Sequence, residues 1–263
     1  MREEWSLRVL MKTKSKICNF HKDACCMRDK SKKDFLGKNF VTAVILAAGS
    51  GKRAGSKTPK QFVKIAGKRI FEYSLEAFIN SKLVNEIIFV VPVTFLKKIK
   101  IKNKKVKIIS GGRRRQDSAV NALKNISGQS DVVLVHDAAR PFVSGNLISS
   151  CIKAAMQNGG AIATSVLSDT IKTGAGGFVR ETLDREKLFR AQTPQAFRSR
   201  YVEKMIGLLS GKKVYTDEAA ALEVLKVKVK LVLNGGENLK ITTASDVKRA
   251  EVILSLDRNK RRI

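Results

Sequence analysis

Residues 45–62 read ILAAGSGKRAGSKTPKQF, an apolar run that leads directly into a glycine loop carrying four cations, Arg53 and Lys60 among them. Small residues let backbone N–H groups approach a phosphate closely, and the cationic side chains add positive charge. The stretch therefore predicts a strand followed by an anion-binding loop. It matches neither G-x-x-x-x-G-K-[ST] nor G-x-G-x-x-G, because residue 54 is alanine and Gly55 falls one position late.

The apolar run is the first of several along the chain. Apolar, β-branched runs lie at residues 41–46, 86–91, 106–109, 131–136, 161–167 and 227–233. Helical patterns lie between several of them, at residues 71–79, 117–126, 147–156 and 247–256. Strands alternating with helices predict an α/β fold with a mainly parallel twisted sheet and helices on both faces. Because ligands bind such sheets at the carboxyl ends of the strands, we expect the chemistry directly after each strand.

Polar residues follow two further strands of the predicted sheet. The string SGGRRRQDS begins at residue 110, and HDAARP begins at residue 136. Asp137, at a strand end, is placed to hold a metal ion or a ribose hydroxyl. Arg140 is placed to pair with a phosphate. His136 is interpreted as structural and Cys151 as a core residue of its helix.

Two helix starts are also indicated. Thr216 is the predicted N-cap of a helix, with Asp217 and Glu218 in the first turn, where the helix dipole favours acidic side chains. Thr243 and Asp246 resemble a capping box in front of the last helical pattern.

The composition limits the classes of protein to consider. The chain has 263 residues, 43% of them hydrophobic, and a formal net charge of +29. No run approaches the roughly 18 apolar residues that span a bilayer, so no membrane partner is expected. The charge fits either a generally lysine-rich sequence or a nucleic-acid-binding protein. Neither zinc-finger spacing nor an aromatic-rich RNA-binding signature is present, so no specific nucleic-acid partner is expected.

The ends of the chain differ from its middle. Residues 1–40 are rich in Lys and Arg without sustained periodicity, and we expect a poorly ordered extension there. The folded domain is predicted at residues 41–257, followed by a basic tail at 258–263. Three of the four cysteines lie within the first 26 residues, which does not resemble a disulfide framework. Reduced thiols and a cytoplasmic location are the simpler interpretation.

Nine strings occur in order between residues 45 and 242: ILAAGSGKR, TPKQF, SGGRRRQDS, VHDAARPF, DTIK, TLDR, QTPQAF, YTDEAAALE and GGENLKIT. Together they resemble the 2-C-methyl-D-erythritol 4-phosphate cytidylyltransferases over about residues 41–256. The resemblance implies a Rossmann-like nucleotidyltransferase domain that joins CTP and a polyol phosphate, with Mg²⁺ held chiefly by the triphosphate. Ribitol-5-phosphate cytidylyltransferases share several of these strings, so they and other nucleotidyltransferases of this fold remain alternatives for the acceptor.

The resemblance also implies roles around the nucleotide. The residues that stabilise the pentavalent phosphorus are Arg53 and Lys60. The backbone contacts to triphosphate and base come from Ala47, Ala48 and Gly49. The residues around the cytosine are Gly112, Arg113 and Ser118. Many family members have an acidic or small residue where this chain has Arg113, so we expect the contact there to come from the backbone.

Around the acceptor, the resemblance implies a second set of residues. Those near the ribose and the acceptor are Asp137, Ala138 and Arg140, and Asp137 is the one protein candidate for Mg²⁺. Those that position the acceptor phosphate are Arg185 and Lys240, with Thr170 and Thr193 nearby. Residues 166–188 interrupt the strand–helix alternation, and in the family they form a projecting β-arm that embraces a second subunit. A homodimer is therefore expected, in which Thr216 serves the partner's site. The glycines at 174, 176 and 177 fit a loop as well.

Overall fold

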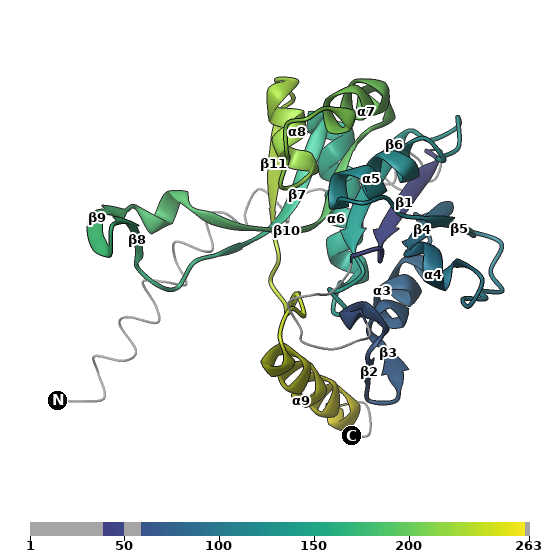
Figure 1. Ribbon diagram of the computed structural model, residues 1–263, viewed down its shortest axis with the longest axis horizontal. Helices are drawn as coiled ribbons and strands as arrows, with labels where there is room; N and C mark the ends of the chain where they lie inside the picture. The colour runs from purple at the N-terminus through teal and green to yellow at the C-terminus, as the bar shows by residue number, and fades with distance from the viewer. Residues whose placement is uncertain (1–38, 50–58, 261–263) are drawn as a thin grey trace, which may run out of the picture. The chain divides into compact units, whose positions relative to one another are not determined.

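Figure 1 shows the computed structural model, which describes residues 39–49 and 59–260, with side chains as far as residue 256. Arg53, residues 1–38 of the expected extension and residues 261–263 of the expected tail lie outside the described residues. Phe40 joins the folded part, because its backbone N–H donates to the Asp131 carboxylate.

A seven-stranded sheet organises the fold, in the order β11-β7-β10-β6-β1-β4-β5. Its strands are β1 (Val41–Leu46), β4 (Glu86–Val91), β5 (Val106–Ser110), β6 (Val132–Asp137), β7 (Gly160–Val166), β10 (Phe189–Arg198) and β11 (Val229–Leu233). The pairs β1–β4, β1–β6, β4–β5 and β7–β11 are parallel. The predicted α/β class with a mainly parallel sheet is confirmed, and each of the six predicted strands lies within two residues of its expected bounds.

Of the seven strands of this sheet, β10 is the one that the sequence did not reveal. It runs antiparallel to both β6 and β7 in the middle of the sheet. Its sequence contains Pro194, and proline within a run argues against a central strand because it cannot donate to the ladder. The register of β10 against β7 shifts between Ala191 and Gln195, so the proline lies where the ladder is interrupted. The Thr193–Pro194 peptide bond is cis.

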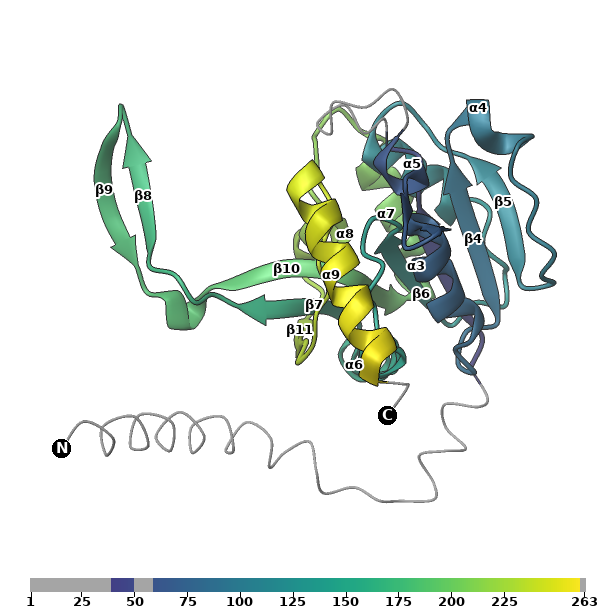
Figure 2. The ribbon, with the colours of Figure 1, turned by 90° about the horizontal axis from the view of Figure 1, so that it is seen from below.

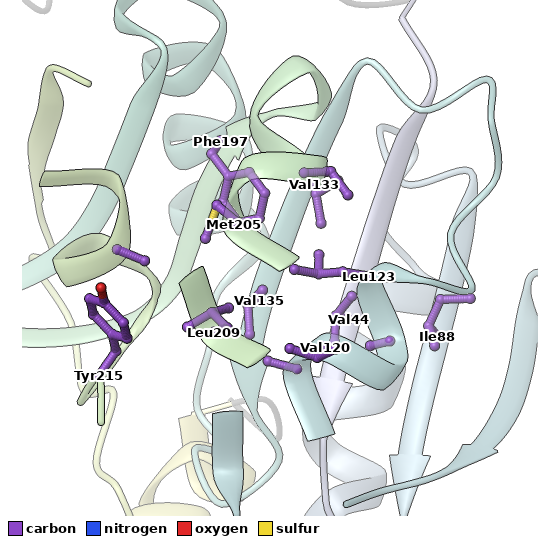
Figure 3. Close-up of a cluster of buried hydrophobic side chains, with 14 of the residues drawn as sticks. Val44, Ile88, Val120, Leu123, Val133, Val135, Phe197, Met205, Leu209 and Tyr215 are labelled. Carbon is purple, nitrogen blue, oxygen red and sulfur yellow. The ribbon is translucent and has the colours of Figure 1, made fainter. Parts of the chain in front are cut away.

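Helices cover both faces of the sheet, as the sequence predicts (Figures 1 and 2). One face carries α5 (Arg115–Leu123), α7 (Val202–Ser210) and α8 (Glu218–Val224). Side chains of these helices pack with Val44, Val133 and Phe197 of the sheet in the cluster of Figure 3. The other face carries α3 (Ile70–Ile79) and α6 (Gly145–Asn158). Since Val133 and Val135 face the first cluster, His136 points to the opposite side, where it contacts Phe78 of α3.

Shorter elements complete the domain. They are the 3-10 turns η2 (Lys60–Phe62), η3 (Arg185–Lys187) and η4 (Ser199–Tyr201), the helix α4 (Val93–Leu96), and the strands β2 (Lys64–Ile65) and β3 (Lys68–Arg69). The last helix, α9 (Ala244–Lys260), includes residues 258–260 of the expected tail. None of the helices in the described part of the chain is both long and apolar enough to cross a membrane.

Of the two predicted helix N-termini, one has the expected cap and the other does not. At α9, Thr243 and Asp246 form the predicted capping box, because each side chain accepts from the other residue's backbone N–H. At α8 the prediction of Thr216 as N-cap is wrong. Asp217 is the N-cap, and its carboxylate accepts from the Ala220 N–H at 3.0 Å. A hydrogen bond from Gln195 holds that carboxylate in place, which a sequence pattern does not reveal.

The segment 166–188 forms a β-hairpin. Its strands β8 (Ile171–Ala175) and β9 (Phe178–Leu183) pair antiparallel, and Gly176 and Gly177 make the turn at φ of 61° and 85°, where side chains are disfavoured. Figure 2 shows the hairpin standing away from the sheet beyond β7 and β10. The predicted arm is therefore a paired hairpin rather than an unstructured loop.

Candidate active site

A cavity of about 670 Å³ lies at the carboxyl ends of β1, β5 and β6, where the fold class predicts ligand binding. Five segments line it: the loop after β1, η2, the β5–α5 loop, the end of β6, and the segment before α9. Of the residues predicted for the site, it brings together Ala48, Gly49, Lys60, Gly112, Arg113, Ser118, Asp137 and Lys240.

The described start of the glycine loop, residues 47–49, is held from two sides. The Ala47 N–H donates to the Val90 carbonyl at 2.7 Å, which ties the loop to β4. The buried Gln61 amide donates to the carbonyls of Ala47 and Gly49, the latter at 2.8 Å. Gln61 therefore fixes residues 47–49, the described start of this loop, relative to η2 and to its neighbour Lys60. Sequence reasoning missed Gln61, although the string TPKQF contains it.

The second loop, between β5 and α5, packs directly against the first. A Cβ atom built on Gly111 would stand 2.2 Å from the Ala48 Cβ, and one on Gly112 would stand 2.4 Å from the Asp117 Cβ. Both positions therefore require glycine for close packing. The Gly112 N–H donates to the Ser118 hydroxyl at 3.0 Å. Arg113 extends from this loop as an exposed side chain.

Asp137 ends β6 inside the cavity wall. Its Oδ2 lies 2.6 Å from the Lys240 ammonium and its Oδ1 lies 3.4 Å from the Arg115 guanidinium. Burial alone would raise the pKa of the Asp137 carboxyl. The charges of Arg115 and Lys240 and the hydrogen bond from Lys240 outweigh burial, so the pKa lies well below its usual range. Asp137 is therefore ionised and paired with two cations.

Arg115 makes its strongest contacts with a residue that sequence reasoning did not place in the site. Its Nη1 and Nη2 donate to the two carboxylate oxygens of Glu218 at 2.8 and 2.9 Å. Burial would lower the pKa of Arg115, but the carboxylates of Glu218 and Asp137 raise it. The arginine run in SGGRRRQDS and the acids in YTDEAAALE were visible, but their pairing across 103 residues was not.

Four predicted residues lie behind the cavity wall. Ala47 and Ala138 are buried, and the Thr193 hydroxyl accepts from the Asp137 N–H and contacts His136 Nδ1. Arg140 is also buried, donating from Nη1 to the Asn238 carbonyl at 2.7 Å, while its Nε has no hydrogen-bond partner. These residues therefore pack beneath the cavity wall rather than lining the cavity.

The remaining predicted residues are not brought to this cavity. Thr170 and Arg185 belong to the hairpin segment and are exposed, and Arg185 donates to the Ser168 carbonyl at 2.5 Å. Thr216 is exposed just before α8.

Comparison with known proteins gives the family. Its sequence model, described as "IspD: 2-C-methyl-D-erythritol 4-phosphate cytidylyltransferase", matches residues 41–256. The chain belongs to this family. The resemblance drawn from the nine strings is thereby confirmed, and so is the assignment as a nucleotidyltransferase enzyme.

Individual relatives agree with this assignment. A 2-C-methyl-D-erythritol 4-phosphate cytidylyltransferase of Clostridium perfringens is 40% identical over 80% of this chain and 97% of its own length. A "Bifunctional enzyme IspD/IspF" of Desulfotalea psychrophila is 41% identical, and the match spans 56% of that protein. The crystal structure of 4-diphosphocytidyl-2C-methyl-D-erythritol synthase from Anaerococcus prevotii has a TM-score of 0.72 at 28% identity, covering 82% of this chain and 96% of that one.

The side chains of this cytidylyltransferase site determine whether it could bind Mg²⁺. Among the described residues, no group of three or more His, Cys, Asp or Glu side chains is placed to hold a metal. Of the described residues that line the cavity, Asp137 alone carries a carboxylate. Mg²⁺ commonly takes one or two carboxylates and completes its shell with substrate phosphates and water. The described lining, with its one carboxylate, therefore fits a cation whose other ligands come from a nucleotide and water.

Proposed function

We propose that this chain transfers a cytidylyl group from CTP to 2-C-methyl-D-erythritol 4-phosphate. A phosphate oxygen of the acceptor attacks the α-phosphorus of CTP, and the bond from that phosphorus to the β-phosphate oxygen breaks. The products are 4-CDP-2-C-methyl-D-erythritol and pyrophosphate. The observation that carries the proposal is the cavity at the strand ends of a member of this family, lined by two glycine loops and by Lys60, Arg113 and Lys240.

The chemistry agrees with the side chains that line the cavity. A phosphate monoester has a second pKa near about 6, so the acceptor is largely a dianion at neutral pH. Its attack needs no general base. The work of the protein is to bring two anions together and to stabilise the charge of the transition state, which cations and backbone N–H groups do.

The placement of the nucleotide follows from the two loops. We place the triphosphate against the glycine loop after β1 and Lys60, with Arg53 contributing from outside the described residues. The cytosine lies against the backbone at Gly112 and Arg113, near Ser118. Gly112 is half-buried and Arg113 is exposed, and both line the cavity.

Mg²⁺ is proposed as the cofactor that accompanies CTP, where it would neutralise phosphate charge. Asp137 is the carboxylate placed to offer it a ligand, and it would give up its contact with Lys240 to do so. Lys240 would then be available to an acceptor phosphate.

The hairpin supports a homodimer. Arg185 and Thr170 lie on the hairpin segment outside the cavity, and the hairpin exposes Phe178 (79%) and Val179 (67%). We propose that the hairpin packs on a second copy, where Arg185, Thr170 and Thr216 complete the partner's acceptor site. The buried free thiol of Cys151 accords with a cytoplasmic location.

A stereochemical assay tests the function together with its mechanism. The protein is incubated with Mg²⁺, methylerythritol phosphate and CTP bearing sulfur at one non-bridging position of the α-phosphorus. We expect a CDP-alcohol with inverted configuration at phosphorus, released with equimolar pyrophosphate. Retention, which indicates two successive displacements, or the absence of a CDP-alcohol would contradict the proposal.

A further inference from the structure

Glu218 is a buried carboxylate beside the active site. It occupies the first turn of α8, and only 1% of its side chain is exposed. Both of its carboxylate oxygens accept from the guanidinium of Arg115, in the bidentate geometry that gives such pairs their orientation. Removing one partner of a buried ion pair leaves the other charge uncompensated, so Glu218 and Arg115 depend on each other.

Arg115 connects Glu218 to the residues of the cavity wall. Its Nη2, which already donates to Glu218, also donates to Asp137 Oδ1, and Lys240 donates to Asp137 Oδ2. Glu218, Arg115, Asp137 and Lys240 thus form one row of alternating charges. The row joins α8, α5, the end of β6 and the segment before α9.

The position of Glu218 does not depend on Arg115 alone. Its neighbour Asp217 caps α8, and Gln195 of β10 donates to the Asp217 carboxylate at 2.9 Å. The same Gln195 accepts from the Ala219 N–H at 2.8 Å. Glu218 therefore stands on a first turn that is fixed on both sides, and it can orient a more exposed partner.

We propose that Glu218 is a positioning residue for cytidylyl transfer. It holds the Arg115 guanidinium against Asp137, so that the Asp137 carboxylate keeps one orientation in the cavity wall while Lys240 exchanges between Asp137 and substrate. It also directs one N–H of each terminal nitrogen of Arg115 toward α8, so that the guanidinium stays beside Asp137. The role rests on the proposed function.

A double-mutant cycle tests this role. Glu218→Gln removes the charge and one good acceptor while conserving shape, and Arg115→Met removes the partner. Glu223→Gln, an exposed acid on the same helix, is the matched control. Each variant is assayed for kcat/KM with CTP, Mg²⁺ and methylerythritol phosphate, at a temperature well below its measured Tm.

We expect Glu218→Gln to lower kcat/KM by about 10–100-fold, the range seen when groups that orient ligating residues are removed. Glu223→Gln should stay within about twofold of the wild type, as surface substitutions do. Because Glu218 acts through Arg115, adding Glu218→Gln to Arg115→Met should cost no further activity. It should also raise the Tm of Arg115→Met, since an unpaired buried carboxylate is removed.

Two results would overturn the role. One is a folded Glu218→Gln variant with kcat/KM within about twofold of the wild type. The other is the same fractional loss from Glu218→Gln with and without Arg115, which would mean that Glu218 acts independently. If the wild type itself forms no CDP-alcohol, the proposed function fails, and the positioning role fails with it. An active wild type with either of the two results overturns the positioning role alone.

Discussion

The backbone of Lys60 is placed by the turn to which it belongs. It begins η2, and the adjacent Gln61 ties that turn to two carbonyls of the glycine loop. The ammonium group of Lys60 is therefore delivered to the cavity beside the backbone that we assign to the triphosphate. A cation in a preset position needs little reorganisation when charge develops in the transition state.

We predict that Lys60→Ala folds normally and loses activity. Removing one charge that stabilises a phosphoryl-transfer transition state lowers the rate by roughly 10²–10⁵. The measurement is kcat on protein whose Tm matches the wild type. Lys64→Ala, an exposed lysine four residues on, is the control and should stay active. A loss below about tenfold for Lys60→Ala would show that its charge plays no part in the chemistry.

His136 has a structural role that depends on its being neutral. It is fully buried on β6, with Nδ1 against the Thr193 hydroxyl and Nε2 against the Arg140 carbonyl. Burial lowers the pKa of His136 to about 4, although the nearby Asp137 carboxylate opposes this shift. Below a pH of about 6.5, His136 binds a proton in the unfolded chain but stays neutral in the folded chain. The free energy of unfolding therefore rises with pH between about 4 and 6.5.

We therefore predict that the wild type loses about 2 kcal/mol of unfolding free energy from this residue between pH 7 and pH 5. This corresponds to a fall in Tm of roughly 4–8 °C. His136→Gln keeps hydrogen-bonding groups but cannot titrate, so its Tm should fall by several degrees less over the same pH range. Calorimetry at pH 5, 6 and 7 provides the measurement. Parallel pH profiles for the two proteins would show that His136 does not take up this proton.

At the scale of elements, the sequence predicted the strands that alternate with helices, and it missed one strand and one helix cap that depend on tertiary contacts. The six apolar runs are strands, because β-branched runs between helical patterns have few other folded solutions. β10 was missed, since Pro194 and the polar QTPQ string look unlike a central strand. The N-cap of α8 was placed one residue early, because the choice between Thr216 and Asp217 depends on Gln195 from another strand.

The residues of the candidate site also divide into those that the sequence could reveal and those that it could not. Residues that follow strands, such as Gly112 and Asp137, could be found from the rule that parallel sheets bind ligands at strand ends. Gln61 and Glu218 could not, because their importance lies in contacts with residues far along the chain. The burial of Arg140 could not be predicted from the sequence either, because it depends on how the whole domain packs.

The hairpin carries a prediction about the acceptor. Arg185 begins η3, separated from the end of β9 by Asp184, and its side chain is exposed. We predict that Arg185→Met raises the KM for methylerythritol phosphate and lowers kcat/KM by roughly 10–150-fold, since a charged hydrogen-bonding contact is lost. Arg185→Lys should recover part of the loss, because lysine keeps the charge but not the fork.

Steady-state kinetics with each substrate varied in turn provides the measurement. Arg180→Met, on the same hairpin and also exposed, is the control. The KM for CTP should stay within about threefold for Arg185→Met, because we assign this residue to the acceptor alone. Damage to CTP binding that spares the acceptor would mean that the two substrates are placed the wrong way round.

At the scale of the molecule, the charge matters for encounter more than for fold. The sequence has 52 Lys and Arg residues against 23 Asp and Glu residues. Both proposed substrates are multiply anionic, so a cationic protein attracts them over a distance of roughly a Debye length. The same charge gives weak, salt-sensitive association with nucleic acids, which requires no specific site.

The proposed dimer predicts complementation between two defective variants. Lys60→Ala damages the cavity of its own subunit, whereas Arg185→Met damages the site of its partner. After subunit exchange, half of the dimers are mixed, and each mixed dimer has one intact site. An equal mixture should therefore reach about a quarter of wild-type activity, because a two-fold axis makes the sites equivalent. Activity no higher than the mean of the two variants, or a fully active monomer in sedimentation, would contradict the dimer.

The most direct test of the central claim is an initial-rate assay of two nucleotides against two acceptors. CTP and UTP are each paired with 2-C-methyl-D-erythritol 4-phosphate and with ribitol 5-phosphate, in the presence of Mg²⁺, and pyrophosphate release is followed. We predict that CTP with methylerythritol phosphate gives the highest kcat/KM, by at least about tenfold over each other pair, a difference of about 1.4 kcal/mol in the transition state. A higher kcat/KM with ribitol 5-phosphate, or equal rates with UTP, would contradict the account.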